Sequence, residues 1–284
     1  MQFGVQAGLQ PGGAEAGAAA AAAAIYVVLL LPTNATMPSE LGHAKVSVET
    51  SYPFGDEVTV RVAATSAVQL FVRVPEWATA ATVSLNGAAP APAKPNAYHL
   101  VSCAADATTI LMLNLNPKII VERHWGDDGI NGVAVTRGPL LFALPLDEVT
   151  TKLGSPYDKC FESGCSQDVQ ITSTEHWSYA LVLPQGNTGP NSTVIDPPGW
   201  SFNKLGSPGR HPFAGRLAPT VAITVEAREL PSWTMDALYI HSPQRLPPSP
   251  VDCSACGPPK SLQLVPFGST RLRVGMLPYT VPPQ

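Results

Sequence analysis

Apolar residues recur at every second position over much of this chain, and this period is the property of β-strands. Val58, Val60 and Val62 alternate with more polar neighbours, and residues 68–74 and 221–225 repeat the pattern. Alternate side chains of a strand point to opposite faces, so such a run presents one apolar face to a core. The chain also has 30 prolines and 23 glycines, which favour short strands joined by frequent turns. Because no long stretch shows helical spacing, the sequence predicts an all-β fold.

The spacing of the strand signals predicts two β-sandwich-like domains in tandem, with long Pro/Gly-rich loops. Strand signals are dense up to residue 146, whereas residues 150–165 and 185–218 are polar and rich in Gly and Pro. A chain of this length suffices for about two domains. We expect four segments: a low-complexity, disordered Ala/Gly-rich segment at 1–24, a remnant strand and linker at 25–45, a β-sandwich at 46–146 and a second β domain at 147–284.

The same alternation predicts which side chains fill the first core. These are Val72, Val74, Val83, Leu85, Val133 and Val135. Asn86-Gly87 is a strong hairpin signal, and the prolines of residues 88–96 predict a loop there.

Charge and hydropathy exclude two classes of partner. The net charge is −4, and no Lys/Arg cluster exceeds a pair of residues, so we expect no nucleic-acid binding. The apolar run that ends at Leu31 falls short of the ~20 residues of a membrane helix, so we expect no membrane span. It also lacks a preceding positive charge, which leaves a disordered N-terminus and an unusual signal peptide as alternatives. Asn34-Ala35-Thr36 and Asn191-Ser192-Thr193 are glycosylation sequons, relevant only in the secretory pathway.

The five cysteines favour disulfides or free thiols over a metal site. Cys160/Cys165 and Cys253/Cys256 are closely spaced, whereas Cys103 stands alone. A structural zinc site needs about four ligands, and the two pairs would have to meet to supply them. We therefore assign no metal ligand and no cofactor.

One charged cluster invites a catalytic interpretation, which we reject. Glu122, His124, Asp127 and Asp128 could resemble the paired carboxylates of a glycosidase. Asp127-Asp128 followed by a glycine is better explained as a turn, so we assign no catalytic residue. Among the five tryptophans, Trp200 lies in a Pro/Gly-rich loop and is the candidate for stacking on a sugar ring.

Five motifs, in order along the chain, resemble glycoside hydrolase family 127 (GH127), the β-L-arabinofuranosidase family. They are the segments 50–54 (TSYPF), 72–78 (VRVPEWA), 83–87 (VSLNG), 133–140 (VAVTRGPL) and 264–273 (LVPFGSTRLR). The resemblance covers about residues 25–278 and corresponds to the middle and C-terminal β-sandwich region of that family. One departure lies after Tyr98, where the family's Arg-x-Trp and Gly-Asp are missing and only Asp106 matches.

The resemblance implies that the catalytic machinery lies outside this region. In the family, an N-terminal (α/α)6 barrel carries a nucleophilic cysteine, a glutamate acid/base and a zinc ion held by cysteines and a glutamate. The nucleophile belongs to a Cys-Cys motif, which this sequence lacks. We therefore expect a non-catalytic β portion of a GH127-like enzyme, inactive alone, whose partners are a catalytic barrel or an arabinose-containing glycan. The alternative is a free-standing carbohydrate-binding or protein-interaction module.

Overall fold

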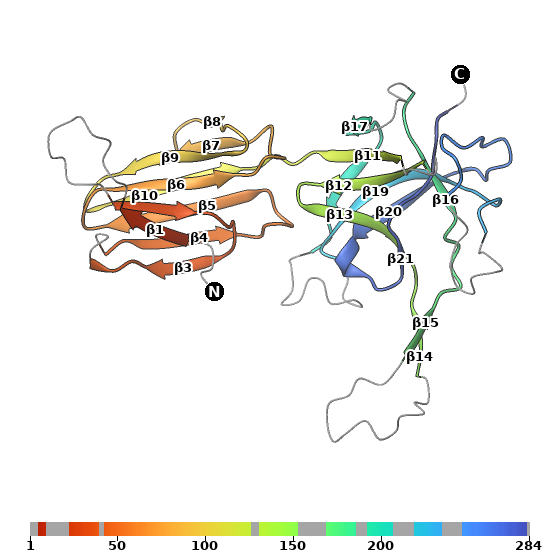
Figure 1. The fold of residues 1–284 in the computed structure, drawn as a ribbon, viewed down its shortest axis with the longest axis horizontal. Coiled ribbons are helices and arrows are strands. Elements are labelled where there is room, and N and C mark those ends of the chain that lie inside the picture. Colours follow the sequence, from red (N-terminus) through yellow and green to blue (C-terminus); the bar gives the residue numbers. More distant parts are fainter. Residues whose placement is uncertain are drawn as a thin grey trace. The chain divides into compact units, whose positions relative to one another are not determined.

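The computed structural model describes residues 5–9, 23–39, 43–125, 131–152, 169–185, 192–206, 219–234 and 246–282. These residues form strands and turns, with a 3-10 turn η2 at Phe267–Ser269 and no α-helix among them. The predicted all-β fold class is confirmed. The chain divides into two compact units, residues 1–117 and 118–284 (Figure 1). Within the described ranges, no helix is long and apolar enough to cross a membrane.

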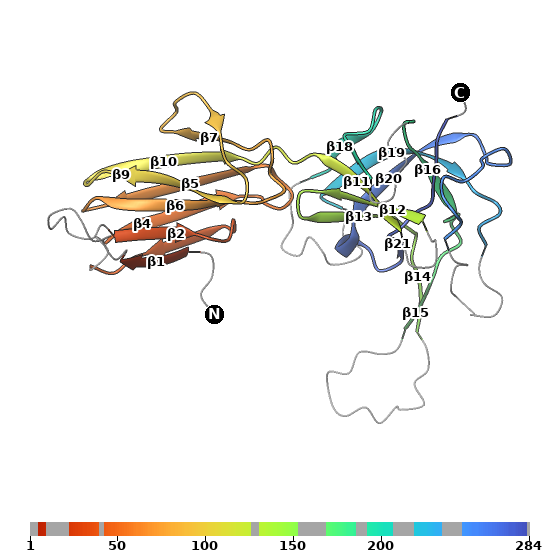
Figure 2. The same cartoon turned by 45° about the horizontal axis from the view of Figure 1, so that its top comes forward.

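The first unit is a sandwich of two sheets (Figures 1 and 2). A four-stranded sheet has the order β1-β2-β6-β9, and a six-stranded sheet has the order β3-β4-β5-β10-β7-β8. The strands are β1 Val5–Leu9, β2 Ala23–Val27, β3 Thr33–Thr36, β4 Lys45–Thr50, β5 Glu57–Ala64, β6 Val68–Val74, β7 Thr82–Leu85, β8 Ala91–Pro92, β9 Ala97–Cys103 and β10 Ala107–Asn114.

Alternating burial explains why these two sheets pack together. Val58, Val60 and Val62 of β5 are fully buried, as are Leu70 and Val72 of β6. The inward residues of both sheets form one hydrophobic cluster. Burying a Val or Leu side chain stabilises the fold by about 1.5–3 kcal/mol, so the period of two supplies the sandwich with its core.

The N-terminal segments differ from the prediction. Val5–Leu9 forms β1, so the disorder expected over 1–24 is wrong there, and the segments 1–4 and 10–22 lie outside the described residues. The predicted linker at 25–45 contributes β2, which pairs with β1 and β6, and β3, which pairs with β4. Composition suggested disorder over 1–24, but β2 begins within this segment, and its Ala23 and Ala24 side chains are buried.

The predicted domain boundary near Asp147 is also wrong, because the units divide between Pro117 and Lys118. The strands β11 Ile119–Trp125, β12 Asn131–Arg137 and β13 Leu140–Pro145 belong to the second unit's sheet. The Gly138-Pro139 break is a tight turn that joins β12 to β13, with Arg137 opposite Leu140. Strand periodicity does not reveal which strands pair, and that choice places the boundary.

The second unit contains a ten-stranded sheet and the separate hairpin β14-β15. The main path runs β17-β11-β12-β13-β20-β19-β16-β22, with β18 beside β19 and β21 beside β13. The sheet curls, because Leu277, just before β22, forms a bridge with Val133 of β12. The remaining strands of the second unit are β14 Val149–Lys152, β15 Val169–Thr172, β16 Tyr179–Val182, β17 Thr193–Ile195, β18 Ser201–Lys204, β19 Val221–Glu229, β20 Pro259–Pro266, β21 Arg273–Val274 and β22 Tyr279–Thr280.

The predicted core residues divide into three groups. Val72, Val74 and Val83 are buried in the first core, as predicted. Val133 and Val135 are buried too, but in the second unit. Leu85 is 37% exposed, so that prediction is wrong. It is the last residue of β7, at the rim beside the Asn86-Gly87 turn.

Candidate functional site

The outer face of the four-stranded sheet carries four large apolar side chains. Tyr26 of β2 lies opposite Phe71 of β6, and Phe71 lies opposite Leu100 of β9. Tyr98 precedes Leu100 by two residues and therefore shares its face. Leu70, the neighbour of Phe71, is fully buried. Alternation thus directs one set of side chains into the core and these four outward.

Aromatic contacts hold this outward cluster together. Tyr26 stacks on Phe71 with ring centroids 4.6 Å apart and planes 9° from parallel. The Tyr98 ring meets Tyr26 edge-on, at 5.7 Å and 87°. Such pairs contribute about 0.5–1.5 kcal/mol each beyond their burial. Tyr98 and Leu100 nevertheless remain 44% and 50% exposed, so the cluster is ordered and still open to a partner.

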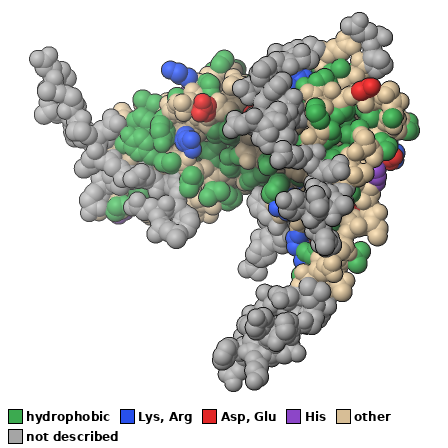
Figure 3. Space-filling model, turned by 45° about the vertical axis from the view of Figure 1, so that its right-hand side comes forward, with side chains coloured by type: hydrophobic (Ala, Val, Ile, Leu, Met, Phe, Trp, Pro, Cys, Tyr) green, Lys and Arg blue, Asp and Glu red, His purple; other side chains and the backbone are tan. Residues whose placement is uncertain are grey.

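The apolar surface continues past Arg73 toward the segment after β2. Arg73 lies opposite Tyr98 in the sheet and also lines a small hollow with Leu29 and Leu31. Both leucines are exposed, at 43% and 39%. We call Tyr26, Leu29, Leu31, Phe71, Tyr98 and Leu100 the apolar face. Hydrophobic side chains also gather visibly over the first unit in the space-filling view (Figure 3).

Two of the five sequence motifs meet at the edge of this face. Tyr52, from the TSYPF segment, stacks on Trp77, from the VRVPEWA segment, with centroids 6.4 Å apart. Burial raises the pKa of the Tyr52 phenol, and the nearby Arg73 cation partly offsets that shift. Both rings pack against the first core. These motifs therefore build the scaffold that carries the apolar face.

The predicted sugar-stacking residue lies in the other unit. Trp200 is half-buried, and its backbone N–H donates to the Pro197 carbonyl in the turn before β18. No feature of the structure tests its sugar contact, so that role stays a prediction. Glu122 is exposed on β11, whereas Asp127, Asp128 and the side chain of His124 lie outside the described residues.

Three of the five cysteines lie within the described residues, and none of these three belongs to a metal-binding cluster there. Cys253 and Cys256 form a disulfide, whereas Cys160 and Cys165 fall outside the described ranges. Cys103 is a buried free thiol whose pKa is raised by burial. The part of the chain that the structure describes brings together no three His, Cys, Asp or Glu residues suited to a metal ion.

Solved structures of known glycosidases share this fold. A glycoside hydrolase is 19% identical, with a TM-score of 0.50, and the match covers 90% of this chain and 36% of that one. A GH127 β-arabinofuranosidase is 15% identical, with a TM-score of 0.50 and coverage of 91% and 36%. A GH127 β-L-arabinofuranosidase from Geobacillus stearothermophilus T6 is 17% identical, with a TM-score of 0.49 and coverage of 91% and 34%. The chain therefore spans about a third of the length of the structures it matches.

The first unit matches a known protein family. No curated protein matches the chain. Residues 24–116 match the family model "Beta-L-arabinofuranosidase, GH127 middle domain", and these limits nearly coincide with strands β2 to β10. The predicted resemblance is thus confirmed, and residues 24–116 are similar to the GH127 middle domain.

Proposed function

We propose that this chain is a structural support for the catalytic (α/α)6 barrel of a GH127-like glycoside hydrolase, and that the barrel docks on the apolar face. The observation that carries the proposal is the exposure of this face on a middle-domain-like sandwich. Leu29, Leu31, Tyr98 and Leu100 are each more than a third exposed. A contiguous apolar surface of this kind marks an interaction site on a soluble protein.

The residue types of the face favour a protein partner over a sugar. Tyr26 and Phe71 turn their ring faces toward each other, so these two faces are not available to stack on a pyranose or furanose ring. Leu29, Leu31 and Leu100 add aliphatic surface, which suits a packed protein interface. Binding of an arabinose-containing glycan is the alternative function, and Tyr98 is the ring most open to it.

The test introduces a charge at Leu100, the most exposed side chain of the apolar face, and supplies the partner as a separate chain. Leu100→Glu should weaken binding of an isolated GH127 catalytic barrel by about tenfold or more, because a buried interfacial carboxylate without a partner is costly. Met112→Glu is the matched control, since Met112 is 44% exposed on a strand of the other sheet. Isothermal titration calorimetry measures both affinities, and circular dichroism checks that both variants fold.

Three results distinguish docking of the barrel on the apolar face from the carbohydrate-binding alternative. Weaker barrel binding in Leu100→Glu alone supports the proposal. Equal binding of the two variants places the docking surface elsewhere and refutes it. Binding of an arabinan oligosaccharide that is lost in Tyr98→Ala, with no barrel binding, favours the carbohydrate-binding alternative.

A further inference from the structure

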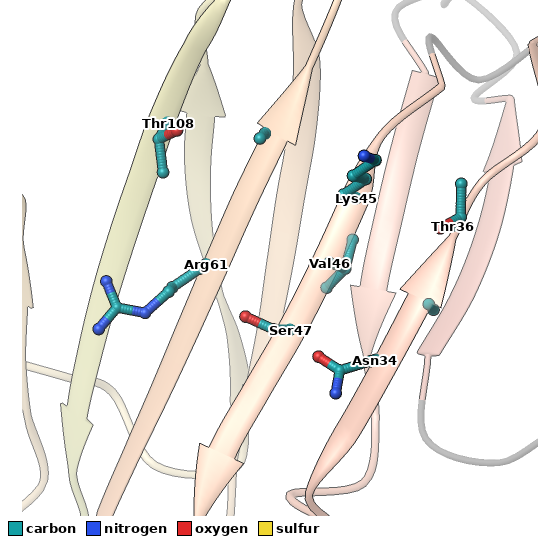
Figure 4. Close-up of a pocket in the computed structure, with 9 residues that line it drawn as sticks. Asn34, Thr36, Lys45, Val46, Ser47, Arg61 and Thr108 are labelled. Carbon is teal, nitrogen blue, oxygen red and sulfur yellow. The ribbon is translucent and has the colours of Figure 1, made fainter.

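A hollow lined by polar and small apolar residues lies on the outer face of the six-stranded sheet, on the opposite side of the sandwich from the apolar face (Figure 4). It has a volume of about 310 Å³ and is lined by residues of β3, β4, β5 and β10. The sheet register places Asn34 opposite Ser47, and Ser47 opposite Arg61. Thr36 lies opposite Lys45 in the next row. Hydroxyl, amide and cationic groups therefore surround the hollow, and these are groups that hydrogen-bond sugar hydroxyls.

The hollow borders a glycosylation sequon, Asn34-Ala35-Thr36, that lies on an edge strand. β3 pairs only with β4 along the described sheet. Asn34 and Thr36 are exposed on the outer face, whereas Ala35 between them packs against the core. A group attached to Asn34 thus meets neither the core nor the β3–β4 hydrogen bonds. The amide of Asn34 points toward Ser47 (Figure 4).

We propose that Asn34 carries an N-linked glycan and that its first N-acetylglucosamine occupies this hollow. The Nδ2 atom of Asn34 attacks C1 of a lipid-linked oligosaccharide diphosphate. The new Nδ2–C1 bond replaces the bond from C1 to the phosphate oxygen, the lipid diphosphate leaves, and the amide loses one proton. Strands about 4.8 Å apart place Arg61 about 10 Å from Asn34, so a pyranose ring on Asn34 lies over Ser47 and reaches toward Arg61.

Two independent features agree with this modification. Cys253 and Cys256 form a disulfide, and disulfides persist in the oxidising secretory compartments where N-glycans are attached. An exposed edge strand also offers unpaired backbone groups to other chains. The sugars beyond the first extend past the hollow, and their bulk beside β3 hinders strand pairing between copies of the protein. The inference does not depend on the docking proposal.

The first experiment measures whether Asn34 is modified. The full chain is secreted from a eukaryotic host behind a cleavable signal, with Asn191→Gln removing the other sequon. We expect one glycan by intact mass, removable by peptide N-glycosidase F, absent in Asn34→Gln and Thr36→Ala, and retained in Thr36→Ser. A secreted, folded protein whose Asn34 peptide is unmodified overturns the proposal.

The second experiment tests whether the sugar occupies the hollow. An endoglycosidase trims the glycan to one N-acetylglucosamine, and the Tm is compared with that of the same protein made without glycan. We expect the single sugar to raise the Tm, and Arg61→Ala to remove most of this rise. Arg73→Ala, an exposed arginine on the other sheet, should keep it. A Tm that the sugar does not change, or a rise unaffected by Arg61→Ala, overturns the assignment of the hollow.

Discussion

Substitution of Glu148 should destabilise the second unit more than the loss of an exposed ion pair does. The carboxylate of Glu148 accepts hydrogen bonds from the backbone N–H of Arg271 at 2.7 Å and of Leu272 at 3.3 Å. The Arg271 guanidinium donates to its other oxygen, with Nη2 at 2.6 Å and Nε at 2.8 Å. The Glu148 side chain is only 11% exposed. One carboxylate thereby fixes the segment before β14 to the segment before β21.

The hydrogen-bond geometry predicts a smaller loss of stability for Glu148→Gln than for Glu148→Ala. Glu148→Gln keeps an acceptor for the two backbone N–H groups but replaces the oxygen that receives the guanidinium. Hydrogen bonds to charged groups are worth about 1.5–3 kcal/mol, and Arg271 is 39% exposed, so we expect a loss of about 1–2 kcal/mol. Glu148→Ala also leaves the N–H of Leu272 unpaired, which raises the expected loss to about 2–4 kcal/mol.

Urea unfolding followed by tryptophan fluorescence measures these losses, because Trp177 and Trp233 are in contact within this unit. Lys118→Met is the control, since it breaks an ion pair with Asp196 whose side chains are 50% and 46% exposed. Such a pair is worth about 0–1 kcal/mol. If Glu148→Ala cost no more than Lys118→Met, the reasoning from burial and hydrogen-bond geometry would be refuted.

The same carboxylate predicts a pH dependence with a definite sign. Burial acts to raise the pKa of Glu148, but the hydrogen bonds and charge of Arg271, together with the Leu272 N–H, outweigh it and lower the pKa. The stabilisation is therefore fully present above the unfolded value of about 4.3 and is lost as the pH falls through the lower folded pKa. The stability difference between the protein and Glu148→Gln should shrink over that acidic range.

Three further predictions follow from the first unit and the whole chain. Leu70→Ala should cost about 2–5 kcal/mol through lost burial and a residual cavity, whereas the exposed Leu85→Ala should cost less than half as much, both by chemical denaturation. Gly87 has φ +79° with open space around it, so Gly87→Ala should cost about 1 kcal/mol through backbone strain alone. Finally, the full chain with zinc and a thiol reductant should release no aryl group from an aryl β-L-arabinofuranoside. Release above a buffer control that is abolished by Glu122→Gln would show a catalytic site in this chain.

The fold class was predictable because burial in a strand has a local signature. Val58, Val60 and Val62 alternate in the sequence and are all fully buried, so one strand's pattern suffices to identify its inward face. The domain boundary was not predictable in this way. Val133 and Val135 show the same alternation as Val72, yet their strand pairs with β11 and β13 in the other unit. Pairing joins segments far apart in sequence, and periodicity carries no information about it.

The apolar face left one signal that sequence reasoning missed. Phe71 occupies an outward position of a strand whose other outward residues include Gln69 and Arg73. A large apolar residue at a position that alternation directs to solvent indicates a second contact surface. The run 25–31 is continuously apolar, so alternation does not reveal the outward direction of Tyr26. Trp200 was a candidate because of its residue type and its Pro/Gly-rich loop, and no periodic pattern there shows what surrounds its side chain.

The two outer faces of the first unit differ in a way that connects the two proposals. The six-stranded sheet turns Ser47, Thr59 and Arg61 outward, whereas the four-stranded sheet turns out Phe71 and Leu100. A sandwich with two solvated faces needs polar residues on both, and under the docking proposal the catalytic barrel covers the apolar one. A glycan at Asn34 lies on the six-stranded sheet and leaves the apolar face free for that partner.

The glycosylated chain and the Asn34→Gln variant should therefore bind the catalytic barrel with equal affinity, while Leu100→Glu weakens both complexes. A glycan that itself reduced barrel affinity would place the docking surface on the six-stranded sheet and refute the assignment of the apolar face.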